Sequence, residues 1–369
     1  MAIDVRRLPD KKLSKMKYLR RLFLPIAILF LASGVFSQGG MQSLKITVVA
    51  NELIFDNPPF RQCHASTLVE LADGRIMAAW FAGTYERHPD VCIWASIKSP
   101  AGWSPPVMLA DGIINDTLRY PCWNPVLFRS KQGELFLFYK VGPSPSEWWG
   151  MYKKSHDDGQ TWSEPVRLPN GILGPIRAKP VYLSCGRIVS PSSTEDGAVW
   201  NVHMELSDNH GQTWSRVSLD TTTGFRIIQP TLLTLANGSL LAFMRSDQNF
   251  IVESRSVDGG STWSRPVLTD IVNPNAGIDA LTLKCGLHLL VYNKGVSGRE
   301  WYEGRSKLFL KASFDGEQWY DVLALEDKTT GEYSYPAIIQ SSDGLVHVSY
   351  TSDRVNIRYM ALRIEKEQP

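Results

Sequence analysis

The strongest constraint on the fold is an eight-residue motif that recurs along the chain. It reads SHDDGQTW at residues 155–162 and returns as SDNHGQTW at 207–214 and SVDGGSTW at 256–263. A shortened copy, SFDGEQW, occupies 313–319, and a degenerate copy, SIKSPAGW, occupies 96–103. The last tryptophans of neighbouring copies are 49 to 59 residues apart. A repeat of this length indicates an array of similar supersecondary units.

The first copy allows three interpretations, because it holds two acids, a glycine and a tryptophan in eight residues. It could be a metal-binding loop, a pair of catalytic carboxylates, or a structural turn. A calcium loop uses more oxygen ligands at longer spacing. Ser and Asp side chains cap turns, glycine supplies positive φ, and a tryptophan ring fills apolar space. We therefore interpret the motif as a turn between outer strands and do not assign its acids to catalysis.

Six segments with the pattern of a β-hairpin alternate with this motif. Each has an apolar run, a turn that contains glycine, and a second apolar run, which is typical of paired antiparallel strands. The segments are 66–81, 124–140, 179–192, 229–245, 279–293 and 335–351. Together with the repeat length, they predict an all-β fold, a six-bladed β-propeller with four antiparallel strands per blade. A strand near 45–54 is expected to complete the last blade and close the ring.

The propeller is expected to form one domain over residues 38–369, because no linker divides it. Residues 1–37 are expected to be a secretory signal peptide, with Met16 as a possible true start. Basic residues precede the apolar run LFLPIAILFLASGVF at 22–36, and small residues follow near Ser37. These are the parts of a signal peptide, and the run is short for a membrane span. The prediction is a secreted or periplasmic protein with no stable membrane insertion after cleavage.

Charge and cysteine content narrow the classes of partner. The net charge of +2 disfavours nucleic acid, since phosphate binding needs a basic stripe. The 12 Trp and 13 Tyr residues suit both strands and surfaces that stack on sugars. The five cysteines form no CxxC pair, so we expect neither a zinc site nor a disulfide framework, and interpret them as buried small apolar residues. No metal or cofactor is expected, and the protein is predicted to be a monomer.

The motif copies resemble the Asp boxes of the sialidase superfamily, and the hairpin segments resemble its blades, over about residues 45–365. The resemblance implies an exo-glycosidase that hydrolyses the bond next to an acidic, carboxylate-bearing sugar. Sialidases bind the carboxylate with three arginines and use a tyrosine nucleophile paired with a glutamate, and an aspartate acid/base. Carried over by register, these roles fall on Arg245 and Arg305, on Tyr335 or Tyr333, and on Asp90.

The chain departs from that family pattern at two positions. His64 occupies the register of the first arginine, and Gln229 occupies that of the glutamate. The chain also resembles propeller-shaped polysaccharide lyases and unusual rhamnosidases, which place histidines near the first blade, as His64 and His88 are here. The alternative to hydrolysis is therefore β-elimination on a uronate-containing glycan, with His64 or a tyrosine as the base. A non-catalytic glycan-binding propeller is the third possibility.

In a propeller, the starts of the inner strands converge at one mouth of the central channel. We expect the residues there to form one site. The predicted catalytic residues are His64, Asp90, Tyr335 and Tyr333. The predicted substrate-binding residues are Arg245, Arg305, Arg177, Lys179, His88, Gln229, Trp123 and Asn124. Such a set of cations and aromatic rings suits an acidic glycan or oligosaccharide.

Each candidate also has a structural interpretation. A histidine before a buried strand can be a satisfied core residue, an arginine can form a surface ion pair, and an aspartate can cap a turn. Tyr335 can be an interior strand aromatic. The tryptophans of GPSPSEWWG, at 142–150, belong either to a rigid connector or to a surface beside the substrate.

Overall fold

The computed structural model describes residues 33–36, 43–197, 199–220, 222, 224–300 and 302–366. All of them belong to one compact unit, residues 32–369. The described residues form 28 β-strands, and no helix among them is long and apolar enough to cross a membrane. The predicted signal peptide lies outside the described residues except for strand β1 (Ser33–Phe36), which pairs with β2 (Leu44–Leu53).

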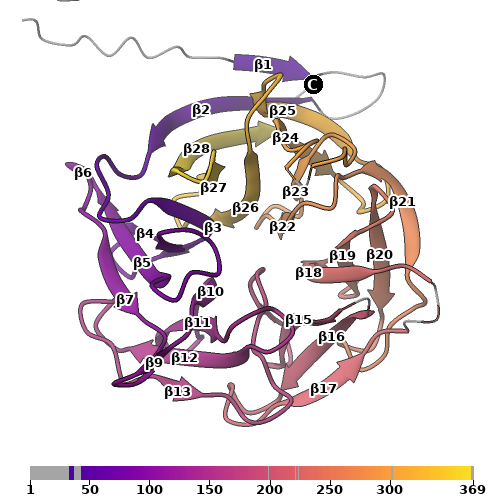
Figure 1. Ribbon diagram of the computed structural model, residues 1–369. Coiled ribbons are helices and arrows are strands. Elements are labelled where there is room, and N and C mark those ends of the chain that lie inside the picture. The colour runs from indigo at the N-terminus through magenta and orange to yellow at the C-terminus, as the bar shows by residue number, and fades with distance from the viewer. Residues whose placement is uncertain are drawn as a thin grey trace, which may run out of the picture. The chain divides into compact units, whose positions relative to one another are not determined.

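The strands of this unit form six sheets around a central axis (Figure 1), as the sequence predicts. Blade 1 holds β3 (Gln62–Glu70), β4 (Ile76–Gly83), β5 (Cys92–Ser99), β6 (Gly102–Trp103) and β7 (Val107–Ala110). Blade 2 holds β10 (Cys122–Arg129), β11 (Leu135–Val141), β12 (Trp149–Ser155) and β13 (Val166–Arg167). Blade 3 holds β14 (Val181–Tyr182), β15 (Ile188–Asp196), β16 (Val199–Ser207) and β17 (Ser215–Ser218).

Blade 4 holds β18 (Ile227–Thr234), β19 (Leu240–Ser246), β20 (Phe250–Ser256) and β21 (Val267–Val272). Blade 5 holds β22 (Asp279–Thr282), β23 (His288–Asn293), β24 (Lys307–Ser313) and β25 (Tyr320–Asp327). Blade 6 holds β26 (Tyr333–Gln340), β27 (Val346–Ser352) and β28 (Asn356–Lys366). A small separate hairpin joins β8 (Ile113–Asn115) to β9 (Leu118–Arg119).

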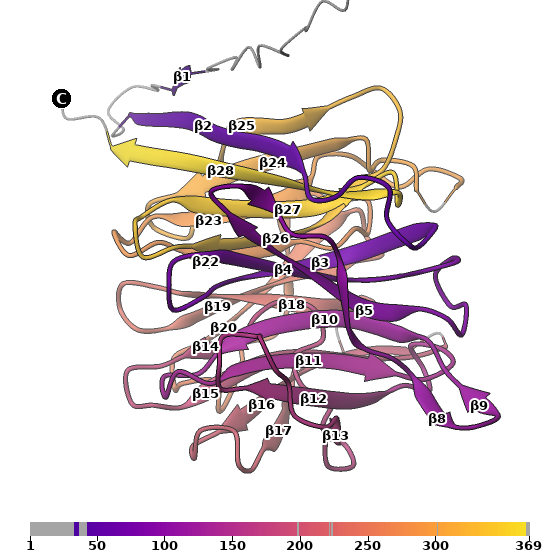
Figure 2. The same ribbon diagram turned by 90° about the vertical axis from the view of Figure 1, so that its left-hand side faces the viewer.

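Blade 6 is completed by strand β2 from the beginning of the described chain. β2 pairs antiparallel with β28 along nearly its whole length, and Figure 2 shows the two strands side by side. The predicted closing strand is thereby confirmed. Closure joins the first blade to the last and pairs the outer edge of β28, which would otherwise be a bare sheet edge.

The Asp-box motifs are turns between the third and fourth strands of their blades, which confirms their structural interpretation. In the first full copy, the Ser155 hydroxyl accepts the amide of Gly159 at 2.7 Å. Asp157 accepts the amide of Thr161 at 2.8 Å, and the Trp162 indole donates to the Gly159 carbonyl at 3.2 Å. The same three bonds recur in the copy that begins at residue 256. The motif satisfies its own polar groups, which leaves the tryptophan ring to pack against the blades.

The second acid of that first copy joins neighbouring blades. Asp158 accepts the amide of Ala72, in the blade 1 hairpin turn, at 3.1 Å and pairs with Arg129 of blade 2.

The cysteine interpretation is correct for three residues and wrong for two. Cys63, Cys92 and Cys122 are buried, whereas Cys185 and Cys285 are exposed. Both exposed cysteines immediately precede the glycine of a hairpin turn, where a small residue points to solvent. All five are free thiols.

Candidate active site

The inner strands carry one repeated irregularity at the same end of the channel. The pairing of the first and second strands shifts register near His64, Trp123, Ile228 and Ser334. A β-bulge of this kind bends the strand and redirects a side chain. The bulged residues with positive φ are Ala65 (53°), Asn124 (40°), Gln229 (54°) and Tyr335 (52°). Proline follows the last three, and because proline has no N–H, it leaves no donor unpaired at the bulge.

The repeat defines six equivalent positions, one in each blade. Each lies six residues before the first residue of its hairpin turn. The residues at these positions are Ala65, Asn124, Arg177, Gln229, Gly277 and Tyr335. A Cβ atom added at Gly277 would lie 3.1 Å from both Arg177 Nε and Tyr335 Cγ. The absence of a side chain at Gly277 therefore leaves space that Arg177 and Tyr335 fill.

Tyr335 lies at the centre of a group of guanidinium ions. The guanidinium carbons of Arg177, Arg245 and Arg305 lie 5.4, 5.6 and 5.8 Å from the centre of its ring. Arg245 Nη1 also donates to the Tyr335 hydroxyl at 2.5 Å. Cations over the face of a tyrosine are attracted by the ring quadrupole. The same three charges favour any negative charge that develops on the phenol oxygen or on a bound anion.

Two of these arginines lie beyond ion-pair distance of every carboxylate that the structure describes. Among the residues that the structure describes, neither Arg177 nor Arg245 forms an ion pair. Arg245 donates instead to the Asn275 side chain at 2.8 Å and to Gln229 Oε1 at 3.3 Å. Gln229 is neutral where a glutamate would cancel the charge of Arg245. The mouth of the channel therefore keeps an excess of positive charge.

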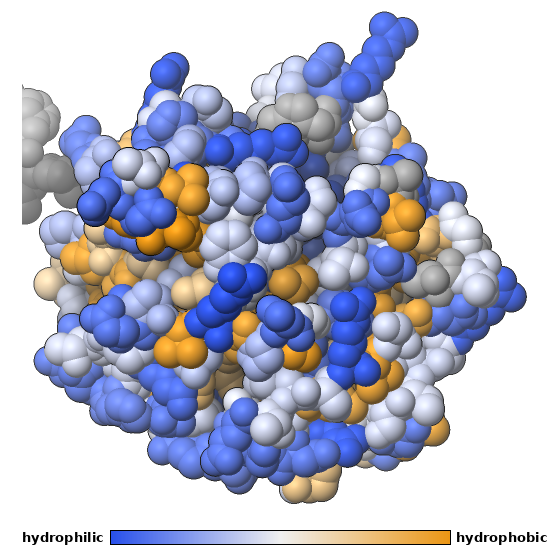
Figure 3. Space-filling view, turned by 60° about the horizontal axis from the view of Figure 1, so that its bottom comes forward, coloured by the Kyte–Doolittle hydropathy of each residue, from blue (hydrophilic) through white to orange (hydrophobic). Residues whose placement is uncertain are grey.

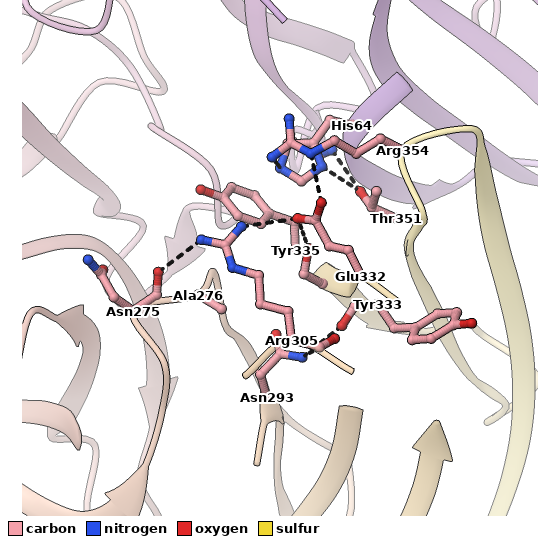
Figure 4. A network of polar contacts seen from close by, with 12 residues as sticks. His64, Asn275, Ala276, Asn293, Arg305, Glu332, Tyr333, Tyr335, Thr351 and Arg354 are labelled. Atoms are coloured by element: carbon pink, nitrogen blue, oxygen red, sulfur yellow. Dashed lines mark hydrogen bonds and ion pairs between the residues drawn. The ribbon is translucent and has the colours of Figure 1, made fainter. Parts of the chain in front are cut away.

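A buried carboxylate links Arg305 to a fourth arginine, Arg354. Glu332 accepts Arg305 Nη1 at 3.0 Å with one oxygen and Arg354 Nε at 2.8 Å with the other. Arg354 also pairs with Glu86. Burial opposes the charge on Arg354, but Glu86 and Glu332 outweigh it and raise its pKa. Figure 4 shows Glu332 between the two arginines, so both guanidinium groups are held in fixed orientations.

His64 lies against Tyr335 and is neutral at pH 7. The two ring centres are 4.2 Å apart, and His64 is only 3% exposed. Burial, followed by the charges of Arg354 and three other arginines, holds its pKa well below the ordinary value. Arg354 donates towards Nε2 at 3.4 Å, which assigns the proton to Nδ1, 2.9 Å from the Thr351 hydroxyl. His64 thus presents a lone pair, and no charge, to the arginine group.

Asp90 and His88 pair with each other at the edge of the site. The Asp90 carboxylate accepts the amide of Thr84 at 2.9 Å and its hydroxyl at 2.5 Å, and lies 2.8 Å from His88 Nδ1. Burial raises the pKa of Asp90, but these hydrogen bonds outweigh it and hold the pKa below its ordinary value. Asp90 is therefore an anion at neutral pH, and its carboxylate caps the loop that follows β4.

Lys179 lies one layer deeper in the channel than the arginines. Its ammonium donates to the Thr67 hydroxyl, two blades away in blade 1, at 3.3 Å. In the same layer, the Thr231 hydroxyl donates to Asp279 at 2.9 Å. Burial lowers the pKa of Lys179 to about 8, although Asp279 opposes the shift. Lys179, Thr231 and Asp279 border a cavity of about 640 Å³ that extends towards the hairpin turns.

Arg177 reaches across the channel beneath Tyr335. Its Nη2 donates to the carbonyl oxygens of Ile278 and Pro336, both at 2.5 Å. Burial lowers its pKa.

Three residues that we predicted for the site do not contact the arginine group through their side chains, in the hydrogen bonds and ring contacts of the described residues. Tyr333 points its ring away from Tyr335 (Figure 4) and packs against the core of blades 5 and 6. Trp123 is only 2% exposed, packs against Trp148 and donates to the Gly142 carbonyl at 2.9 Å. Its ring, which we predicted to bind substrate, is enclosed by the 142–148 segment and offers no exposed face. Asn124 is buried at its position in the ring of six.

The structure adds residues that the sequence did not reveal. Arg354 follows β27 in a turn that has no Asp-box copy, so no motif marks it. Glu332 directly precedes the inner strand of blade 6, a position that the convergence of strand starts could have identified. Glu195, at the end of β15, interacts electrostatically with Arg245, and burial raises its pKa.

The comparisons with known proteins agree with this architecture. The sequence model of the family described as BNR repeat-like domain matches residues 74–348. A protein named anhydrosialidase, from Macrobdella decora, is 27% identical over 176 residues, which are 44% of this chain and 22% of the leech protein. The match therefore spans less than a quarter of that relative.

Solved structures share the fold at low sequence identity. A protein of unknown function from Dyadobacter fermentans superposes with a TM-score of 0.70 at 18% identity, covering 87% of this chain and 99% of that one. NanB sialidase from Streptococcus pneumoniae superposes with a TM-score of 0.67 at 15% identity, covering 85% and 70%. Because the family match extends over most of the propeller, the chain belongs to the BNR repeat-like family of the sialidase superfamily.

Proposed function

We propose that this protein cleaves the glycosidic bond next to a carboxylate-bearing sugar. The observation that carries the proposal is the group of arginines around Tyr335, two of which lack a carboxylate partner among the described residues. Arg forks bind carboxylates in a bidentate manner, and they bind more strongly where water is excluded. The names of the similar proteins, an anhydrosialidase and a sialidase, support a sialidase-type glycosidase.

Tyr335 is the proposed nucleophile. Arg245, 2.5 Å away, would stabilise the phenolate that forms when the phenol proton passes to water, and the oxygen would attack the anomeric carbon as the glycosidic C–O bond breaks. The positive φ of Tyr335 holds the ring at the channel mouth at a cost of about 1 kcal/mol or more. Backbone strain at this position is consistent with a side chain whose placement matters for function.

Two carboxyl groups are candidates for the proton donor to the leaving oxygen. Asp90 is the group predicted from sequence, but its hydrogen bonds favour the anion. Glu195 has a pKa raised by burial, which suits a proton donor. Asp90→Asn and Glu195→Gln separate the two. The variant that lacks the donor should lose activity on an alkyl glycoside and keep it on a nitrophenyl glycoside, whose leaving group needs no proton.

The test of the proposed function is a panel of acidic oligosaccharides with products identified by mass. The wild type should release an acidic monosaccharide, and Arg245→Ala should lose at least about 100-fold in kcat/KM. Arg255→Ala is the matched control, because Arg255 lies on the next strand of the same blade, at the surface, and pairs with Glu253 and Glu317. Full activity in Arg245→Ala would contradict the proposal.

A second candidate is β-elimination on a uronate-containing glycan, favoured by the neutral His64 beside Tyr335. A neutral imidazole can remove the proton next to a carboxylate that arginine neutralises. Elimination leaves a conjugated unsaturated uronate that absorbs in the ultraviolet, and hydrolysis does not. Products that lack one water but show no such absorption would indicate an internal transfer. The absorbance of the products decides between the two candidates.

We further propose that the protein is exported, on the basis of the basic and apolar segments within residues 1–37. Sequencing the amino terminus of the protein recovered outside the cytoplasm should give a start near Ser37. Recovery of the uncleaved chain from the cytoplasm would contradict this proposal.

A further inference from the structure

The Asp box of blade 3 is packed differently from the boxes of blades 2, 4 and 5. A Cβ atom added at Gly159, in the blade 2 box, would lie 2.5 Å from Met77 of blade 1. At the equivalent Gly260 and Gly316, it would meet Val189 and Leu235 of the preceding blades at 3.3 and 2.8 Å. At Gly211 it meets only Trp214 of its own box, at 3.4 Å. The blade 3 box therefore stands away from blade 2.

The apolar core between blades 2 and 3 is correspondingly small. Clusters of ten or more buried apolar residues lie across the other five blade junctions. The cluster at the face of blade 2 that meets blade 3 has four buried residues, Val126, Phe136, Phe138 and Leu168. The tryptophans of the other boxes pack against the large clusters, whereas Trp214 lies outside the clusters of the described residues.

A segment inserted between the two blades makes buried polar contacts at this junction. The segment 168–178 lies between the two blades, where Lys140 of blade 2 donates to the Pro175 carbonyl. Glu205 of blade 3 accepts the amides of Leu173 and Gly174 at 2.7 and 2.8 Å. Lys140 and Glu205 are fully buried, and burial lowers the pKa of Lys140 to about 7. These buried polar contacts lie beside the small apolar cluster of the junction.

The gap is a cavity of about 320 Å³, which we call the blade 2–3 cleft. Its volume falls within the range of small-molecule sites, roughly 300–1,000 Å³. Six aromatic side chains line it, Phe128, Phe136, Phe138, Tyr152, Tyr182 and Trp214. His210 and Gln212, both exposed, and Lys154 supply polar groups at its rim. Figure 3, with the lower side of Figure 1 turned forward, shows apolar patches at the surface between hydrophilic side chains.

The lining favours a neutral ligand with one apolar face and several hydroxyl groups. Aromatic rings offer flat apolar faces, and the imidazole of His210 and the amide of Gln212 can bond hydroxyls at the edge. Lys154 is not available for an anion, because its ammonium lies 3.6 Å from Glu134 and over the Phe136 ring. A pyranose ring combines an apolar C–H face with an equatorial belt of hydroxyls and so matches this lining.

We propose that the blade 2–3 cleft is a second carbohydrate site, which binds a neutral pyranose residue of the glycan. The choice of ligand class rests on the proposed function. The cleft lies near the hairpin turns of blades 2 and 3, at the opposite end of the inner strands from Tyr335. One sugar residue cannot occupy both sites. The cleft would hold a distant part of a branched or polymeric substrate and raise its effective concentration at the mouth.

The test is a calorimetric titration of the full chain carrying Tyr335→Phe with methyl galactoside, methyl glucoside and methyl mannoside. At least one should bind with a dissociation constant on the order of 1 mM, as expected for so small a ligand. Adding Trp214→Ala should weaken that binding at least about tenfold. Adding Trp200→Ala, the control, should leave it unchanged, since Trp200 packs against Arg226 outside the cleft. Because these methyl glycosides carry no carboxylate, the proposed reaction does not act on them, and the result does not depend on the proposed chemistry.

Two outcomes of the titration would overturn the proposal. One is binding that Trp214→Ala leaves unchanged, which would place the sugar elsewhere. The other is the absence of sugar binding, with or without binding of cyclohexanol, which would make the cleft an apolar cavity only. In the otherwise wild-type chain, Trp214→Ala should lower kcat/KM on a polymeric glycan and leave it unchanged on a small chromogenic glycoside. Equal effects on both substrates would also contradict the proposal.

Discussion

The channel mouth and the Asp-box turns are both repeated features, but they repeat in different ways. The boxes repeat backbone and side chains together, so that the same Ser, Asp or Asn, Gly and Trp contacts recur from blade to blade. At the mouth the bulge recurs, while the residue at the same position changes from Ala65 to Gln229 to Tyr335. A contact that recurs in each copy stabilises each blade in the same way, so its role is structural. A shared backbone that carries different side chains builds one asymmetric site.

The largest effect should come from changing the mouth. Tyr335→Phe removes the hydroxyl that accepts a hydrogen bond from Arg245, and it keeps the ring that packs among the arginines. We expect activity on an acidic glycan to fall at least about 10³-fold, because the proposed nucleophile is lost. The midpoint of thermal unfolding should stay within a few degrees of the wild type. If Tyr335→Phe retained the turnover of the wild type, the channel mouth would not be the catalytic region, and its contrast with the structural Asp-box turns would be wrong.

The next effect should come from a box tryptophan. Trp263→Ala removes a ring that packs against the core of blades 3 and 4, and should lower the free energy of unfolding by about 3 kcal/mol. Trp214→Ala should cost less, because that ring packs against no comparable core. Denaturant titration measures both, and kcat of the folded fraction should be unchanged. An equal loss of stability in the two variants would contradict the packing difference between the boxes.

A smaller difference should separate two glycines with similar φ. Gly159→Ala and Gly211→Ala share the cost of a Cβ at positive φ, about 1–2 kcal/mol, since the angles are 81° and 85°. Only Gly159→Ala also displaces Met77, so it should be less stable than Gly211→Ala by about another 1 kcal/mol. Unfolding in urea measures the difference. A less stable Gly211→Ala would reverse our description of the blade 2–3 junction.

The smallest effect should be a change in acid sensitivity. The hydroxyl and amide of Thr262 lower the pKa of Asp258 from 3.8 to about 2. A lowered folded pKa stabilises the protein above the unfolded pKa, and that contribution is lost as the pH falls from about 4 to about 2. In Asp258→Asn, the free energy of unfolding should depend less on pH in that window, because asparagine does not titrate. The turn should still form, since Asn209 bonds the hydroxyl and amide of Thr213 in the blade 3 box. The size is modest because Asp258 is exposed. If the free energy of unfolding of the variant changed with pH as steeply as that of the wild type, the lowered pKa of Asp258 would be contradicted.

The sequence was a good guide to the fold because turn chemistry is local. Asp157, Gly159 and Trp162 act within their own eight residues, so counting the copies located the blades. Arg245, Gln229 and Tyr335 could be placed because each lies at a fixed offset from a hairpin turn. The structure brings these three within hydrogen-bonding distance around Arg245.

The rest of the site depends on contacts between distant blades, which no local pattern encodes. Arg354 reaches Glu86, 268 residues away, from a turn that carries no motif. The burial of Trp123 follows from the fold of the 142–148 segment over it. The blade 2–3 junction holds two buried polar side chains, Lys140 and Glu205, in strands whose sequences have the ordinary hairpin pattern.

The most direct test of the central claim is the affinity of the mouth for a carboxylate. Calorimetry on Tyr335→Phe should be run with an acidic monosaccharide, chosen from the products that the wild type releases, and with its primary amide. We predict binding of the acid that is at least about tenfold tighter than that of the amide, with the difference removed by Arg245→Ala and kept by Arg255→Ala. Equal affinity for the acid and the amide would contradict the claim that these arginines form a carboxylate site.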